Sequence, residues 1–117
     1  MGENVVLIKS KLFAIRIVKL YQWVTEQKKE FVLAKQLLRS GTSIGANVRE
    51  AHHAQSKREF VAKMNIALKE AAETEYWLEL LHEAGYLNVK EFGSVGKDCV
   101  EIKSLLIAII KSSNRKI

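Results

Sequence analysis

The stretch Leu37-Leu38-Arg39-Ser40-Gly41-Thr42-Ser43-Ile44-Gly45-Ala46-Asn47-Val48-Arg49-Glu50 decides the fold of this chain. A stripe of apolar and small residues runs through it at alternating spacings of three and four, which is the period of one helix face. The members of this stripe are Ala34, Leu37, Gly41, Ile44, Val48 and Ala51. Gly inside a helix costs about 1 kcal/mol relative to Ala. Gly41 and Gly45 therefore predict that a second helix packs very close at this point.

Apolar stripes of the same period predict four helices that account for nearly the whole chain. They are expected at residues 5–26, 30–53, 57–84 and 89–113. Ser56 and Glu59 have the spacing of a capping box, which would start the third helix. Asn88 offers a cap for the fourth helix, and Gly85 suits the left-handed residue that ends many helices. Short connections between long helices predict an all-α domain, an antiparallel up-down-up-down four-helix bundle over residues 1–117.

Length and composition indicate a single domain that needs no disulfide or structural metal to be stable. The chain has 117 residues and one cysteine, Cys99, which cannot form an internal disulfide. No apolar run approaches the ~20 residues needed to span a membrane, and no N-terminal signal segment is recognised, so we expect a cytoplasmic protein with no membrane partner. The longest apolar run, residues 105–110, predicts a helix turn that is buried on every side.

The first predicted helix carries more apolar residues than one core needs. Leu12 and Trp23 lie to one side of its central stripe, and Val18 lies to the other. A core-facing helix needs a narrower stripe, so the outer flank predicts a subunit interface and a homo-oligomer. The alternative is a generous core that the aliphatic stems of Arg16 and Lys9 partly cover.

The charge is strongly basic and unevenly spread. The net charge is +6, with thirteen Lys and Arg against five acids up to residue 69, and two Lys against eight acids over residues 70–101. Such a balance favours polyanionic partners, because phosphate neutralisation drives binding to nucleic acids regardless of sequence. The candidate nucleic-acid-binding residues are Lys35, Arg39, Arg49, Lys57, Arg58, Lys111, Arg115 and Lys116, with Lys9, Arg16 and Lys19 of the first helix as further candidates.

Neutralisation within the protein is the alternative explanation of this charge. Three glutamates lie four apart on one face of the third helix: Glu75, Glu79 and Glu83. In an antiparallel bundle they would lie beside the start of the second helix, where Lys35 and Arg39 are found. Lys57, Arg58 and the C-terminal cations have no such partner in the pattern, so they are the stronger candidates for contact with a phosphate backbone.

Metal chemistry is disfavoured by spacing. Two Glu-x-x-His pairs, Glu50 with His53 and Glu79 with His82, have the form used in di-iron bundles. They would lie about 35 Å apart along the bundle at 1.5 Å per helical residue, too far to share a metal pair. Cys99 lies on an apolar stripe with no nearby His, which argues against a nucleophile. We therefore predict no metal, no cofactor and no catalytic residue.

The quoted stretch also carries a structural motif of four residues: Gly41, Ser43, Gly45 and Asn47. It lacks the Lys-Ser or Lys-Thr of a phosphate loop and follows no strand. The glycines are interpreted as a close-packing device. Ser43 and Asn47 lie four residues apart and are predicted to be buried, with hydrogen bonds along or between helices.

A set of residues along the chain resembles the family of bacterial four-helix bundle proteins also called 23S rRNA intervening-sequence proteins. These residues are Arg39, Ser43, Ile44, Ala46, Asn47 and Glu50, then Ser56-Lys57-Arg58-Glu59-Phe60, then Ala67, Glu73, Leu80-Leu81 and Gly85-Tyr86-Leu87. The resemblance covers essentially the whole chain, and its most specific part is the segment from Ser43 to Glu50. Some members are encoded within insertions in the ribosomal RNA gene.

The resemblance implies an antiparallel four-helix bundle and, as in related members, a homopentamer around a central channel. A relative is the accessory protein of diversity-generating retroelements, a basic pentamer that binds nucleic acid and a reverse transcriptase. Together with the charge, this predicts a non-enzymatic, homo-oligomeric protein that binds RNA or DNA. The alternative is a protein–protein adaptor or scaffold that has a protein partner and no nucleic-acid role.

Overall fold

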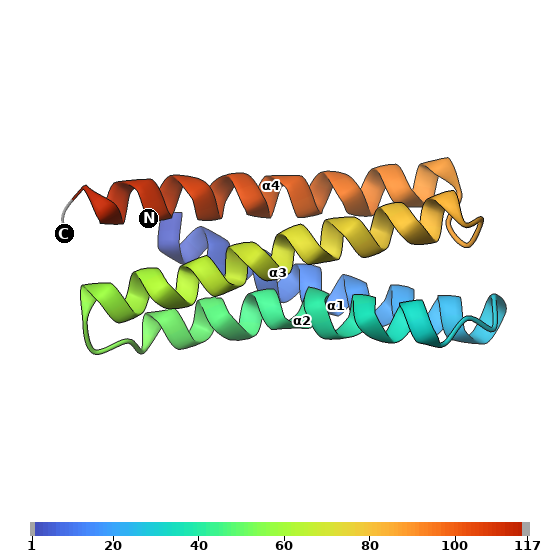
Figure 1. Ribbon diagram of the computed structural model, residues 1–117, viewed down its shortest axis with the longest axis horizontal. Coiled ribbons are helices and arrows are strands. Elements are labelled where there is room, and N and C mark those ends of the chain that lie inside the picture. The colour runs from blue at the N-terminus through green and yellow to red at the C-terminus, as the bar shows by residue number, and fades with distance from the viewer. Residues whose placement is uncertain (1, 116–117) are drawn as a thin grey trace.

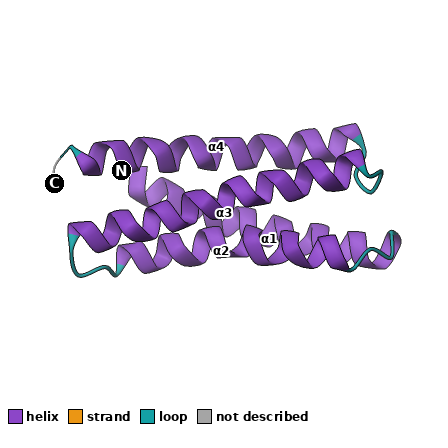
Figure 2. Cartoon of the chain, viewed as in Figure 1, coloured by secondary structure: helices purple, strands orange, loops and turns teal. Residues whose placement is uncertain are grey.

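Four long antiparallel helices pack into one bundle in the computed structural model, which describes residues 2–115 (Figure 1). The helices are α1 Gly2–Gln27, α2 Val32–His52, α3 Lys57–Glu83 and α4 Val89–Asn114. Short loops join them, and no strand occurs within the described residues (Figure 2). α1 and α3 each pack against both α2 and α4. The predicted all-α four-helix bundle is confirmed.

The helix boundaries differ from the predicted ones by up to three residues. α1 begins at Gly2 rather than residue 5. α2 begins at Val32 rather than residue 30, because the Glu30 carboxylate stays outside the helix and accepts hydrogen bonds from the backbone N–H groups of Val32 and Ala34, at 3.2 and 2.8 Å. Lys29, with φ +54°, turns the chain just before this start. The remaining ends lie within one residue of expectation, at Gln27, His52, Glu83 and Asn114.

Capping explains where α3 and α4 start. The Ser56 hydroxyl accepts from the Glu59 N–H at 3.1 Å, and Asn88 Oδ1 accepts from the Glu91 N–H at 2.7 Å. The Glu59 carboxylate reaches back to the N–H of Gln55 at 3.0 Å, one residue before the usual capping-box partner. After α3, Gly85 has φ +92°, which an L side chain rarely adopts.

Close packing of α1 on α2 accounts for the glycines of the quoted stretch. A Cβ at Gly41 would lie 2.8 Å from Cγ2 of the Ile17 side chain, and a Cβ at Gly45 would lie 3.2 Å from the backbone oxygen of Ser10. Ile17, Ile44 and Val48 are fully buried beside them. The predicted close approach of a second helix is confirmed, and the helix is α1.

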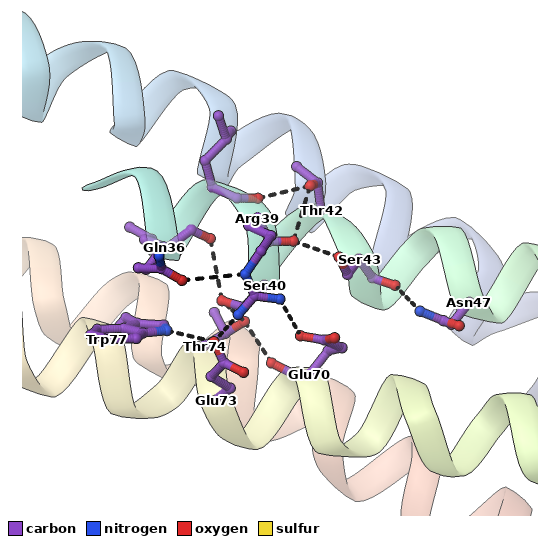
Figure 3. A network of polar contacts seen from close by, with 12 residues as sticks. Gln36, Arg39, Ser40, Thr42, Ser43, Asn47, Glu70, Glu73, Thr74 and Trp77 are labelled. Atoms are coloured by element: carbon purple, nitrogen blue, oxygen red, sulfur yellow. Dashed lines mark hydrogen bonds and ion pairs between the residues drawn. The ribbon is translucent and has the colours of Figure 1, made fainter. Parts of the chain in front are cut away.

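Ser43 and Asn47 are half-buried, so their predicted burial is wrong. The Ser43 hydroxyl donates to the carbonyl of Arg39 at 2.6 Å, and the Asn47 amide donates to the carbonyl of Ser43 at 2.8 Å (Figure 3). Both bonds run along α2, because the residues that face the core here are the next ones along the chain, Ile44 and Val48. The buried polar contact between helices is instead made by Ser40 and Thr74, whose hydroxyl oxygens lie 2.9 Å apart.

The apolar run of residues 105–110 is only partly covered, so the prediction of burial on every side is wrong for the single chain. Leu106 and Ile110 are buried, but Ile107 is 38% exposed. The reason is geometric: α4 packs on α1 and α3 only, and this leaves its outer side to solvent. Within residues 2–115 none of the helices combines the length and apolarity needed to cross a membrane.

Candidate nucleic-acid interface

The C-terminal turns of α2 and α4 and the first turn of α3 lie at one end of the bundle, beside the start of α1 (Figure 1), and each of these turns carries exposed basic residues. We call this set the basic end; it consists of Arg49, Lys57, Arg58, Lys111 and Arg115. All are exposed, and none forms an ion pair with another described residue. No ion pair within the described residues therefore neutralises these charges.

Two of these cations occupy an unfavourable place. Lys57 and Arg58 are the first two residues of α3. The N-terminus of a helix carries a partial positive charge, so cations there are destabilising by about 0.3–1 kcal/mol each. Glu59 in the same turn offsets part of this cost. The local field of the helix adds to the charge of the two side chains, so this turn attracts anions.

Two acids close in sequence to the basic end, Glu50 and Glu59, make other contacts. Glu50, next to Arg49, forms an ion pair with Lys63 at 2.8 Å. This pair raises the pKa of Lys63 above its ordinary value, chiefly through the hydrogen bond to Glu50. The carboxylate of Glu59 accepts from the backbone of Gln55. Glu50 is therefore paired away from the basic end, whereas Glu59 keeps its charge, and Glu3 lines a hollow together with Lys57 without an ion pair to a described residue.

Arg39 has a structural role rather than a free charge. Its guanidinium contacts the carboxylates of Glu70, at 3.3 Å, and of Glu73 (Figure 3). Glu73 also accepts from the indole N–H of Trp77 at 2.8 Å. Arg39 thus ties α2 to α3, and we leave it out of the interface. The charge of Arg39 is thus neutralised within the protein, as the alternative hypothesis predicted. Its partners, however, are Glu70 and Glu73 rather than the predicted Glu75, Glu79 and Glu83.

The remaining predicted cations divide in the same way. Lys9 and Arg16 of α1 pair with Glu101 and Asp98 of α4, at 3.0 and 2.7 Å. Lys35 is exposed without an ion pair to any described residue, but it lies in the first turn of α2, at the opposite end of the bundle. The predicted residue Lys116 lies outside the described residues.

Glu75 pairs with Lys103 of α4, at 2.7 Å, instead of with the start of α2. The expected partner helix was therefore wrong for this residue. Its hydrogen bond to Lys103 raises the pKa of that amine. This ion pair links α3 to α4, as the ion pairs of Arg39 link α2 to α3.

The residues considered for metal or nucleophilic chemistry are held apart. His82 Nδ1 lies 2.8 Å from the carbonyl oxygen of Leu87, and its ring stacks on Phe92 with centroids 4.5 Å apart. Within residues 2–115 no cluster of three His, Cys, Asp or Glu side chains could hold a metal ion. Cys99 is buried, which raises the pKa of its thiol to about 12, so the thiol stays protonated at neutral pH.

The chain is similar in sequence and in fold to known proteins. A sequence profile described as 23S rRNA-intervening sequence protein matches residues 2–108. The chain belongs to this family. A solved structure from Bacteroides thetaiotaomicron VPI-5482, described as a protein with unknown function from the S23 ribosomal protein family, is 58% identical and superposes with a TM-score of 0.94. That match covers 95% of this chain and 99% of the other.

No curated protein matches the chain. The family assignment confirms the resemblance drawn from the sequence, and the described relative carries no assigned activity. In this member of the 23S rRNA-intervening sequence family, the structure adds one basic residue that sequence reasoning missed. Lys11 of α1 lines a surface hollow together with Arg49 of α2. Only the packing of α1 on α2 brings the two together, so no local sequence signal could have paired them.

Proposed function

We propose that this protein binds RNA or DNA through the basic end and acts without catalysis, as part of a homo-oligomer. The observation that carries the proposal is the unpaired charge of Lys57 and Arg58 in the first turn of α3, where the helix dipole disfavours cations. Charges that cost folding stability are typical of functional sites rather than of structural ones. A phosphate backbone would neutralise them and release its counterions.

The test is charge reversal of both residues, Lys57→Glu with Arg58→Glu. Binding to a structured ribosomal RNA fragment and to a random duplex is measured by fluorescence anisotropy at several salt concentrations. Each lost phosphate contact lowers the salt slope by about 0.9, so we expect the double variant to lose roughly tenfold or more in affinity and up to about two units of slope. A variant that keeps the original affinity and salt dependence would refute the proposal.

A matched control is available on α4. Lys90→Glu with Lys97→Glu makes the same change in net charge, and these two lysines lie in the half of α4 that is remote from the basic end. We expect the control to reduce affinity far less. Loss of fold does not confound the result, because acids at the start of α3 improve the dipole interaction, so the variant with Lys57 and Arg58 reversed should unfold at a higher temperature.

The proposed assembly rests on an apolar stripe along the outer side of α1. We call it the α1 stripe: Val5, Ile8, Leu12 and Ile15, which are 40, 61, 60 and 45% exposed. It lies opposite the buried stripe of the same helix, so no helix of this chain covers it. A second copy of the chain is the occupant we propose, and a homopentamer is the assembly that the family resemblance favours. Several copies would raise affinity for one nucleic acid through multivalency.

Sedimentation velocity tests the assembly. Leu12→Glu is expected to lower the mass to that of the single chain, because it puts a charge in the middle of the α1 stripe. Ile66→Glu, at an exposed apolar position of α3, is the control and should leave the mass unchanged. A wild-type protein that sediments as a single chain, or a Leu12→Glu variant of unchanged mass, would refute this part of the proposal.

A specific observation favours the adaptor as the second candidate. A hollow of about 330 Å³ lies between α3 and α4, with Leu78, Phe92 and Val100 among its apolar lining residues and Glu75 and Glu79 beside them. An apolar groove with acidic neighbours suits a basic amphipathic helix of a partner protein. Absence of RNA and DNA binding at low salt would leave this adaptor role as the better account.

A further inference from the structure

A second hollow, between α1 and α2, adjoins the basic end and has a different character. We call it the α1–α2 hollow. Its volume is about 210 Å³, and it is lined by Leu7, Lys11, Ala14, Thr42, Gly45, Ala46 and Arg49. It exists because the two helices approach closely at Gly45 while short side chains, Ala14 and Ala46, stand on either side. The result is a shallow apolar floor of small residues.

Charge distinguishes this hollow from four others along the described residues. Lys11 and Arg49 are exposed and form no ion pair with another described residue. None of its lining residues is acidic. The other hollows each include at least one carboxylate, from Asp98 and Glu101, from Glu3, from Glu75 and Glu79, or from Glu91.

An apolar floor flanked by two free cations and no acid suits a flat heterocycle whose neighbours on both sides are phosphates. We propose that the α1–α2 hollow holds one unpaired base of single-stranded nucleic acid, with the adjoining phosphates at Lys11 and Arg49. This inference rests on the proposed function, and it adds that unpaired segments are preferred over duplex. A duplex keeps its bases stacked inside, so it cannot offer one to a hollow between helices.

The side chains supply the contacts that such a base needs. A guanidinium plane such as that of Arg49 can stack on a base and also bind phosphate, whereas the amine of Lys11 acts as a point charge for phosphate. Thr42 donates its hydroxyl proton to the carbonyl of Leu38 at 2.7 Å. Its oxygen therefore keeps acceptor capacity, which suits the exocyclic amino group of a base.

Filling the hollow without changing charge tests the inference. Ala46→Leu places a larger side chain on the floor, and Leu is a good helix former. Ala72→Leu, at an exposed position of α3, is the matched control. The probes are an RNA stem-loop with 2-aminopurine in the loop, a DNA stem-loop of the same sequence, and a blunt duplex. Anisotropy reports affinity, and 2-aminopurine fluorescence reports stacking of the unpaired base.

We expect Ala46→Leu to weaken loop binding by roughly tenfold, as loss of one stacked base does, and to abolish the fluorescence change. Duplex affinity and the salt slope should stay unchanged, and Ala72→Leu should behave as wild type. The RNA and DNA arms show which of the two backbones the site prefers.

Two outcomes would overturn the inference and leave the proposed function standing. In the first, Ala46→Leu binds the loops as wild type does, while reversal of Lys57 and Arg58 still removes binding. In the second, Ala46→Leu changes the sedimentation mass and not the affinity, which would assign the hollow to a neighbouring copy. If the variant with Lys57 and Arg58 reversed still binds both the loops and the duplex as wild type does, the proposed function itself is refuted.

Discussion

Gly41→Ala is the substitution whose effect the structure fixes most sharply. The added Cβ would lie 2.8 and 2.9 Å from Cγ2 and Cγ1 of Ile17, distances that real Cβ contacts do not show. These atoms are attached directly to the Ile17 Cβ, itself 3.2 Å away, so they cannot swing aside as the tip of a long side chain could. Either α1 or Ile17 must move.

The magnitude follows from two opposing effects. Ala in place of Gly in a helix interior gains about 0.8–1 kcal/mol. Overpacking a filled core costs about 1–3 kcal/mol. Gly93→Ala in α4 has the gain alone, because a Cβ there would meet nothing within 4 Å. We therefore expect Gly93→Ala to stabilise the protein, and Gly41→Ala to be less stable than Gly93→Ala by about 1–3 kcal/mol.

Urea unfolding followed by circular dichroism measures both values, at one fixed protein concentration because assembly would add to apparent stability. Repeating Gly41→Ala in an Ile17→Ala background removes the two closest atoms. In that background the same substitution should become stabilising, by an amount near that of Gly93→Ala. A Gly41→Ala protein as stable as Gly93→Ala would refute the close packing of α1 on α2 at this point.

Three further predictions follow from buried or terminal groups. Ser40→Ala and Thr74→Val should each cost about 1–3 kcal/mol, because each leaves a buried hydroxyl short of a partner, whereas the double variant should cost less than the two single costs together. The Cys99 thiol, with its pKa raised to about 12 by burial and by Glu75, keeps its proton while the unfolded chain ionises near pH 9. Stability should therefore fall above pH 9, and wild type at pH 10 should lose about 1.4 kcal/mol more than Cys99→Ala, relative to pH 8. Ser56→Ala and Asn88→Ala should each lower the free energy of unfolding by about 1 kcal/mol through loss of a helix cap.

The same unfolding assay decides all three. Additive costs for Ser40→Ala and Thr74→Val would mean that their hydroxyls do not interact. Equal slopes of stability against pH for wild type and Cys99→Ala would contradict the raised pKa. Unchanged stability on loss of either cap would mean that water replaces the side-chain acceptor at that helix start at no cost.

The fold could be predicted from the sequence because each signal was local or periodic. The stripe through Gly41 and Ile44 predicted a helix and its core-facing side, and the two glycines predicted that another helix packs close to it. Ser56 and Gly85 marked helix ends through backbone chemistry that acts within a few residues. None of these signals needs knowledge of which helix lies beside which.

Contacts between long side chains could not be predicted in the same way. Arg39 selects Glu70 and Glu73 because of the axial offset between α2 and α3, and Glu75 selects Lys103 because its side of α3 meets α4. A shift of one helical turn, about 5.4 Å, would exchange these partners. The pattern of charges in the sequence contains no measure of that offset, so the split between structural and free cations emerged only from the packed structure.

That split gives a physical reason for placing function at the end of the bundle. Along its sides every helix runs beside two others, so some cations, such as Arg16 and Lys103, meet a carboxylate on the next helix, whereas others, such as Lys11, do not. At the ends the helices stop, neighbours are fewer, and a charge in the last or first turn keeps its solvent-facing field. The chain places Lys57 and Arg58 there at some cost in stability, and Arg49 of the same end lines a hollow that is free of acids. The proposed binding of a nucleic acid at this end therefore predicts that charge reversal there changes binding without weakening the fold.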